Sequence, residues 1–131
     1  MAEEVRKTVL IIEKQPDYAQ LLARQIRFAG LIPLVAVTGA GGLRKVEERR
    51  PDLILLELEL TDMDGLDFVL TLRQKPEADG IPIVAMSALP HMKAKALESG
   101  CSDFLLKPIM MIDLMAHVKK FLRREVVVGG V

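Results

Sequence analysis

The stretch PDLILLELELTDMDG, residues 51–65, constrains the fold of this chain more than any other. Its centre is an unbroken apolar run from Leu53 to Leu56, followed by Glu57 and a polar segment that ends in Asp64-Gly65. A short apolar run bounded by turn-forming residues is typical of a strand that is covered on both faces. Open α/β sheets bind ligands beyond the carboxyl ends of their strands, so Glu57 is a candidate functional group. Taken on its own, Glu57 would be interpreted first as a surface residue that closes a strand.

Apolar runs and helical periodicity alternate along the whole chain. We expect strands at residues 8–12, 31–37, 52–57, 81–86 and 104–106, and helices at about 16–29, 38–49, 65–75, 90–99 and 110–124. Short strand–helix units require parallel strands joined by right-handed crossovers. The pattern therefore predicts an α/β fold, a doubly wound five-stranded parallel sheet with helices on both faces. Residues 76–80 are expected to form an exposed, mobile loop.

Composition excludes several classes of protein. Lys+Arg and Asp+Glu both number 18, so the formal net charge is zero, which argues against nucleic-acid binding by this domain. The sequence contains no run of about 18 apolar residues that would span a membrane, and its charged start lacks the apolar core of a secretory signal. The single cysteine, Cys101, fits a reducing cytoplasm and is expected to be a small packed residue rather than a reactive thiol.

Polar groups follow four of the predicted strands. Glu13-Lys14 follow the first strand, Glu57 the third, Ser87 the fourth and Lys107 the fifth. The carboxyl ends of parallel strands meet at one edge of a sheet, so we expect these side chains to converge near the topological switch point. Together they form a candidate site.

This combination resembles the response-regulator receiver domains of two-component, or phosphorelay, signal transduction. The resemblance extends from Thr8 to Arg124 and rests on the PDLILLELELTDMDG block, on PIVAMSA and on DFLLKP. It implies a flavodoxin-like (βα)5 domain over residues 1–125, with residues 126–131 as a tail or the start of a linker. In that family an Asp at the end of the third strand accepts a phosphoryl group from a histidine kinase, and two acids after the first strand hold Mg²⁺.

Several positions match the family pattern. By resemblance, Ser87 and Lys107 would contact the phosphoryl oxygens, Pro108 would follow a cis peptide bond, and Phe104 would be the aromatic residue whose ring turns inward on activation.

Other positions depart from the pattern. Glu57 replaces the phosphoacceptor Asp, and Glu13 and Lys14 stand in place of the two metal-binding acids. An extra methylene shifts the Glu57 carboxylate, and an ammonium offers Mg²⁺ no lone pair. We hypothesise that Lys14 pairs with Glu57, Glu13 or Glu59, the last being the remaining metal-site equivalent. Glu57 would then reach toward Ser87 and Lys107, partly as a phosphoryl group would.

Three functions are compatible with this sequence. We favour a non-enzymatic pseudo-receiver, an atypical receiver domain that acts by protein–protein interaction without phosphorylation or a cofactor. The alternative is a working receiver in which Glu13 and Glu59 assemble a Mg²⁺ site and Glu57, or a neighbouring acid, accepts the phosphoryl group. A flavin or nucleotide binder is disfavoured because EKQP, after the first strand, lacks a phosphate-cradling glycine. The site could also be a decayed ion cluster with no switching role.

A protein partner is expected, either a histidine kinase or an attached effector domain. By resemblance, a homodimer would use the face formed by residues 90–99, 104–106 and 110–124, where Met92, Met110 and Met111 either contact the partner or pack inward.

Four further polar residues are expected to have structural rather than ligand-binding roles. His91 and His117 lack a metal-spaced partner, and Asp62 and Asp64 are expected to be turn residues rather than cation ligands.

Overall fold

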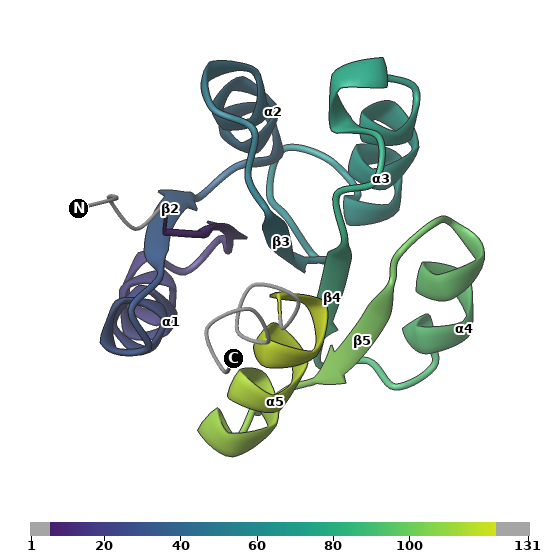
Figure 1. Cartoon of the computed structure of the whole chain (residues 1–131). Coiled ribbons are helices and arrows are strands. Elements are labelled where there is room, and N and C mark those ends of the chain that lie inside the picture. The colour runs from purple at the N-terminus through teal and green to yellow at the C-terminus, as the bar shows by residue number, and fades with distance from the viewer. Residues whose placement is uncertain (1–5, 123–131) are drawn as a thin grey trace.

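The computed structural model describes residues 6–122, so the expected tail at 126–131 and the last two residues of the expected final helix lie outside the described part. Strands and helices alternate along the chain (Figure 1). The strands are β1 (Thr8–Ile12), β2 (Ile32–Ala36), β3 (Leu53–Glu57), β4 (Ile83–Ser87) and β5 (Asp103–Leu106). The helices are α1 (Pro16–Phe28), α2 (Gly39–Glu48), α3 (Gly65–Arg73), α4 (Met92–Glu98) and α5 (Met111–Leu122), with a 3-10 turn, η1 (Pro76–Ala78). No helix within residues 6–122 is long and apolar enough to cross a membrane.

The five strands form one parallel sheet in the order β2-β1-β3-β4-β5. This is the flavodoxin-like strand order, so the predicted fold class is confirmed. The register pairs Ile12 with Leu56, Glu57 with Met86, and Ser87 with Leu106. The ends of β1, β3, β4 and β5 are therefore level with one another, which places the residues that follow them at one edge.

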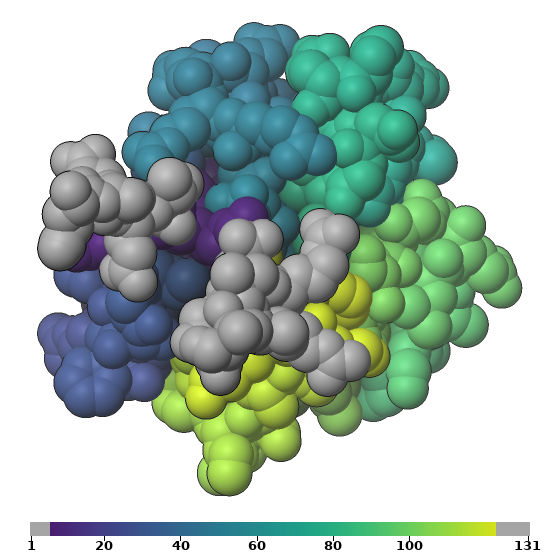
Figure 2. Space-filling model, in the orientation of Figure 1, coloured from purple at the N-terminus to yellow at the C-terminus, as the bar shows by residue number. Residues whose placement is uncertain are grey.

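Helices cover both faces of the sheet. Helices α1 and α5 lie on one face, and α2, α3 and α4 lie on the other (Figure 1). Because side chains alternate along a strand, β1 sends Leu10 and Ile12 into one core and Val9 and Ile11 into the other. In the space-filling view, purple atoms of the N-terminal segment can be seen between the colours of α1 and α2 (Figure 2). Every residue of β3 is buried, as its continuous apolar run predicts.

The glycine-rich start of α2 has a packing role. The Thr38 hydroxyl accepts a hydrogen bond from the Gly41 amide at 3.0 Å and caps the helix. A Cβ atom at Gly42 would lie 2.5 Å from Cδ1 of Ile12. The glycine at position 42 therefore allows the start of α2, which looks weak by propensity, to pack directly against β1.

The segment at residues 76–80 differs from its prediction. It contains η1, and Ala78 is fully buried in the core beside α3. The Arg50 guanidinium donates hydrogen bonds to the carbonyl oxygens of Glu77 and Asp79, at 3.2 and 2.7 Å. The segment is therefore exposed at four of its five residues, as expected, but it is anchored at Ala78 and held by Arg50. Strand β4 begins two residues later than expected, since Pro82 has no N–H to donate to a strand ladder.

Candidate functional site

The carboxyl edge of the sheet brings together the four polar positions identified from the sequence. Glu13 follows β1, Glu57 ends β3, Ser87 ends β4 and Lys107 follows β5. Glu13 and Ser87 are fully buried and Glu57 is 2% exposed, whereas the Lys107 side chain is 19% exposed. Two buried carboxylates at one sheet edge need a cation or several hydrogen-bond donors nearby.

Lys107 supplies that cation. Its ammonium lies 2.8 Å from Oε1 of Glu13 and also donates a hydrogen bond to Oε1 of Glu57. The Tyr18 ring packs against the same ammonium, with its centroid 5.0 Å away, and the Lys107–Pro108 peptide bond is cis. Burial alone would lower the pKa of Lys107, but the hydrogen bonds and charges of the two glutamates together raise it above its ordinary value. Lys107 is therefore protonated at neutral pH and bridges the two carboxylates.

The second oxygen of each bridged carboxylate also has a partner. The Gln15 amide donates to Oε2 of Glu13 at 3.0 Å, and the Glu59 amide donates to Oε2 of Glu57 at 2.9 Å. All four carboxylate oxygens of Glu13 and Glu57 are therefore engaged within the protein, the condition under which buried charges are tolerated.

Ser87 pairs with Glu59 rather than with Glu57. Its Oγ lies 2.9 and 3.0 Å from the two carboxylate oxygens of Glu59 and accepts a hydrogen bond from the Leu89 amide at 3.0 Å. The expectation that Glu57 reaches both Ser87 and Lys107 is thus wrong for Ser87, since both Glu57 oxygens are taken by Lys107 and by the Glu59 amide. Two carboxylates therefore share these contacts: Glu59 pairs with the Ser87 hydroxyl, and Glu57 pairs with the Lys107 ammonium.

Burial raises the pKa of Glu59. The Ser87 hydrogen bond and the charge of Lys14 oppose this rise, whereas the adjacent Glu57 carboxylate adds to it. Glu59 is the partly exposed member of the three site glutamates.

The ion pair expected for Lys14 does not form. Among residues 6–122, Lys14 makes no salt bridge with Glu13, Glu57 or Glu59, and it acts on Glu59 only through space. Lys107 already bridges Glu13 and Glu57, and the half-buried Lys14 lies nearby without an ion pair to either.

The residues present do not fit a Mg²⁺ site of the family type. Mg²⁺ requires several oxygen ligands in near-octahedral geometry. The carboxylate oxygens of Glu13 and Glu57 instead accept hydrogen bonds from Lys107 and from backbone amides. Within residues 6–122, no three His, Cys, Asp or Glu side chains are grouped so that they could hold a metal ion. Lys14 adds a positive charge where the family pattern has an acid.

Phe104 lies inside the protein. It is 9% exposed and belongs to the core that also contains Ala85 of β4 and Ala96 of α4, against which Met92 packs.

The two aspartates of the β3–α3 loop cap helices. Asp64 is the N-cap of α3 and accepts from the Leu66 amide at 2.8 Å. Asp62 instead accepts from the Gly39 and Ala40 amides of α2, at 2.8 and 3.0 Å, and these hydrogen bonds lower its pKa. This contact joins residues 23 positions apart and was not predicted from the sequence. The sequence did predict a helix start at Thr38-Gly39, and the free amides of a helix start are where a carboxylate binds.

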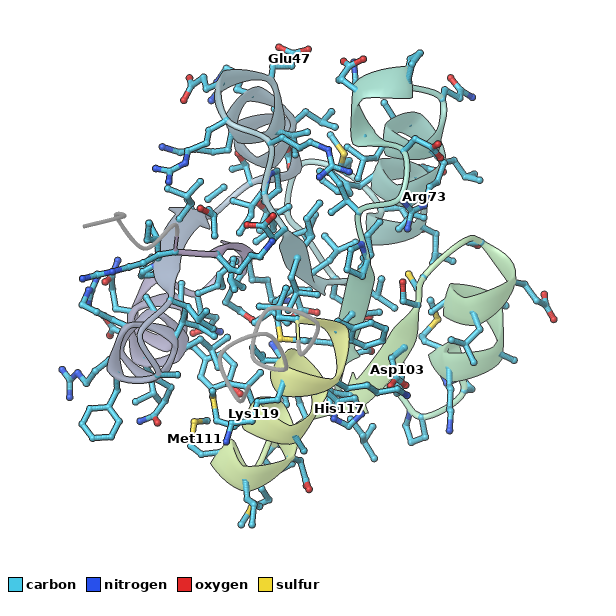
Figure 3. All side chains as sticks on the ribbon, viewed as in Figure 1. Glu47, Arg73, Asp103, Met111, His117 and Lys119 are labelled. Atoms are coloured by element: carbon cyan, nitrogen blue, oxygen red, sulfur yellow. The ribbon has the colours of Figure 1, made fainter. Side chains whose placement is uncertain are left out.

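The remaining candidates lie away from the site. His117 links β5 to α5: its Nε2 lies 3.2 Å from Asp103 and its Nδ1 2.8 Å from the Asp113 carbonyl oxygen (Figure 3). His91 is exposed just before α4. Cys101 is buried, and this burial raises the pKa of its thiol to about 11.

Of the three methionines proposed for an interface, only one is largely exposed. Met110 is 63% exposed, whereas Met92 and Met111 are half-buried and pack against the two cores.

Comparison with known protein families finds one match over most of the chain. The model of the family described as the response regulator receiver domain matches residues 9–119. The transcriptional regulatory protein PrrA of Mycobacterium tuberculosis is 35% identical over 119 residues, which are 89% of this chain and 50% of that protein. The DNA-binding response regulator MtrA of Mycolicibacterium smegmatis is 35% identical over 125 residues, covering 94% of this chain and 54% of that protein. The chain thus spans about half the length of the curated relatives it matches.

Solved structures agree with the fold. A two-component response regulator from Clostridium difficile superposes with a TM-score of 0.84 at 31% identity, covering 91% of this chain and 98% of that one. The chemotaxis response regulator CheY4 of Vibrio cholerae has a TM-score of 0.84 at 22% identity, over 89% of this chain and 99% of that one, and indicates the fold alone.

Proposed function

The chain belongs to the response regulator receiver domain family, and from that membership we propose that it is a pseudo-receiver, a signalling domain that works without a phosphorylation cycle. Receiver domains are signalling modules of two-component systems rather than typical enzymes. On this proposal, the domain acts in the cytoplasm through the protein surface that it presents.

One observation carries the proposal: Lys107 bridges Glu13 and Glu57. A phosphoacceptor must present a free carboxylate oxygen to the phosphoryl donor, and both Glu57 oxygens are engaged below the surface. The pairing of Ser87 with Glu59 similarly occupies the hydroxyl that would contact a phosphoryl group. The inward Phe104 ring is compatible with a domain held permanently in one signalling arrangement.

The test is a titration of ¹⁵N-labelled protein with Mg²⁺ and then with beryllofluoride, a phosphoryl mimic, followed by amide shifts. The proposal predicts no site shifts at millimolar Mg²⁺ and no spread of shifts to Phe104. Shifts at Glu57 and Ser87 that propagate to Phe104, or a gain of one phosphoryl mass from a small phosphodonor, would contradict it.

The alternative is a working phosphoacceptor that uses Mg²⁺. The observation in its favour is that Ser87 and Lys107, the two groups that match the family's phosphoryl contacts, lie at the same edge as Glu57. Phosphorylation would then require Lys107 to release Glu57.

Partners follow from the same family membership. Relatives nearly twice as long are named as transcriptional or DNA-binding regulators, so an attached effector domain or a histidine kinase is the proposed partner class. A homodimer is proposed through α4, β5 and α5, where the exposed large apolar residues are Leu97, Leu106, Ile112 and, just before α5, Met110. Met92 and Met111 contribute mainly to packing.

A further inference from the structure

Strand β2 lies at one end of the sheet and, among the strands of residues 6–122, pairs only with β1 (Figure 1). The stretch from Leu31 to Val37, LIPLVAV, contains no charged side chain. An edge strand presents unpaired N–H and C=O groups to other chains, and proteins commonly protect such edges with lysine or proline. Pro33 is the one such residue in this stretch. The outer edge of β2 is therefore a candidate contact surface.

The hydrogen bonds between β2 and β1 determine which backbone groups face outward. The Ile32 amide donates to the Lys7 carbonyl oxygen at 2.9 Å, and the Glu13 amide donates to the Ala36 carbonyl oxygen at 3.0 Å. Successive residues of a strand turn their backbone groups to opposite sides, so Ile32, Leu34 and Ala36 face β1. The residues between them face away from the sheet.

The outward groups between residues 33 and 37 are two acceptors and two donors. The acceptors are the carbonyl oxygens of Pro33 and Val35, and the donors are the amides of Val35 and Val37. An antiparallel copy of the same strand, related by a two-fold axis at Val35, would pair all of them. The two Val35 residues would exchange N–H···O hydrogen bonds, and the Val37 amide of each copy would face the Pro33 carbonyl oxygen of the other.

Pro33 also selects the register of such a contact. If the second strand slid so that Val35 lay opposite Pro33, the Val35 carbonyl oxygen would face a nitrogen that carries no hydrogen. An unpaired buried acceptor of this kind is costly. A slide in the other direction would pair Val35 with Val37, beyond the end of β2, and would leave the Pro33 carbonyl oxygen unused. The register centred on Val35 avoids both losses.

Helix α2 carries complementary charges beside this edge. A hollow of about 300 Å³ lies along the edge, between residues 35–38 and a side of α2 that includes Arg44, Lys45 and Glu48. Within residues 6–122, none of these three side chains forms an ion pair. A two-fold axis reverses the helix of the second copy, so the Glu48 end of one α2 would face the Arg44 end of the other. Opposite charges would then approach across the contact.

We propose that two copies of this chain associate through the outer edges of β2, as antiparallel strands that join the two sheets into one. The second copy is favoured over an unrelated extended segment because it supplies both the matching register at Pro33 and the reversed charges of α2. The contact lies at the opposite end of the sheet from β5. It is therefore separate from the dimer proposed through α4, β5 and α5, and it goes beyond the proposed function.

The experiment uses the Leu106→Lys variant, in which a new charge blocks the α4–β5–α5 contact. Amide hydrogen exchange is measured at protein concentrations from about 10 µM to about 1 mM, a range suited to a contact of a few backbone hydrogen bonds. The outward amides of Val35 and Val37 should exchange at least about fivefold more slowly at the highest concentration. The amides of Leu34 and Ala36, which face β1, should not change. Sedimentation velocity over the same range should show monomer and dimer only.

Two further substitutions, made at Val37 in the same variant, separate the hydrogen bond from the side chain. Val37 is 41% exposed and its amide faces away from β1, so neither substitution removes a hydrogen bond within the sheet. Val37→Pro lacks the amide donor and should weaken the dimer about tenfold, because two hydrogen bonds per dimer are lost. Val37→Thr keeps the donor and is the matched control, which should associate as the parent variant does.

Exchange at Val35 that does not depend on protein concentration would overturn the inference, as would equal association of the Pro and Thr variants. Oligomers larger than a dimer would also overturn it, because a two-fold contact closes on itself. The exchange measurement leaves the β2 edge unaltered, so it tests the inference even if Val37→Pro does not fold. Phosphorylation of the protein would bear on the proposed function and not on this contact.

Discussion

The Lys107 ammonium lies 2.8 Å from the Glu13 carboxylate, although 94 residues separate them in the sequence. Neither group could be buried alone, because an unpaired charge in a protein interior is costly. Lys107 also contacts Glu57, so both buried carboxylates at the carboxyl edge of the sheet are paired with a cation of the protein itself.

Lys107→Met should lower the free energy of unfolding by about 3 kcal/mol at neutral pH, because it leaves Glu13 and Glu57 buried without a cation. The raised pKa of Lys107 means that its contribution is complete at neutral pH and is lost only as the pH rises through that raised value. Urea denaturation measures both effects.

Lys14→Met is the matched comparison for this substitution. It removes a cation that forms no ion pair within residues 6–122, so its effect should stay within about 0.5 kcal/mol. An equal loss from the two substitutions would show that the bridge is not the stabilising contact.

Glu59→Gln should change how stability depends on pH. The pKa of Glu59 is raised in the folded protein, so the wild type gains stability as the pH falls from that raised value toward the unfolded-state value. The Gln variant lacks this titration and should therefore gain stability relative to wild type as the pH rises toward neutrality. Urea denaturation across mildly acidic to neutral pH tests the sign. Glu98→Gln, on the exposed side of α4, controls for net charge.

Converting the site back toward the family pattern should create metal affinity. Glu57→Asp shortens the side chain by one methylene and should weaken its contact with Lys107, and Lys14→Asp replaces a repelling charge by a ligand. The double variant should bind Mg²⁺ in the millimolar range, seen as amide shifts at Glu13 and Glu59, and Glu57→Asp alone should bind it more weakly. If the double variant still shows no shifts, the arrangement of the backbone, and not these two side chains, excludes the metal.

Asp62→Ala should loosen the start of α2. The lost hydrogen bonds to Gly39 and Ala40 should cost about 1 kcal/mol and should speed hydrogen exchange at those two amides. Because the pKa of Asp62 is lowered, its contribution should persist at neutral pH and vanish as the pH falls through that lowered value. Thr61→Ala, one exposed residue earlier, should leave both observables unchanged.

If the domain dimerises through α4, β5 and α5, Leu106→Lys should weaken the dimer at least about tenfold by placing a charge in the contact. Light scattering during gel filtration, over a range of protein concentrations, measures the change in the dimer dissociation constant. Leu70→Lys makes the same substitution at a similarly exposed site on α3 and should leave the association unchanged.

The local pattern of the sequence determined the fold and the location of the site. Apolar runs such as Leu53–Leu56, separated by helical periodicity, require parallel strands, and parallel strands bring Glu13, Glu57, Ser87 and Lys107 to one edge. These features follow from periodicity and connection length, which are properties of neighbouring residues.

The contact of Glu57 with Lys107 was expected from the sequence, but the tertiary structure decided that Ser87 pairs with Glu59 and that Lys107, not Lys14, pairs with Glu13. Glu57 and Glu59 are two residues apart, yet one meets Lys107 and the other Ser87, because the Glu59 amide turns back onto Glu57 as the chain leaves β3. Lys14 and Lys107 both follow the carboxyl end of a strand, but of these two lysines only Lys107 reaches the buried carboxylates. Such choices depend on distances of a few ångströms between segments far apart in the chain, and local pattern carries no information about them.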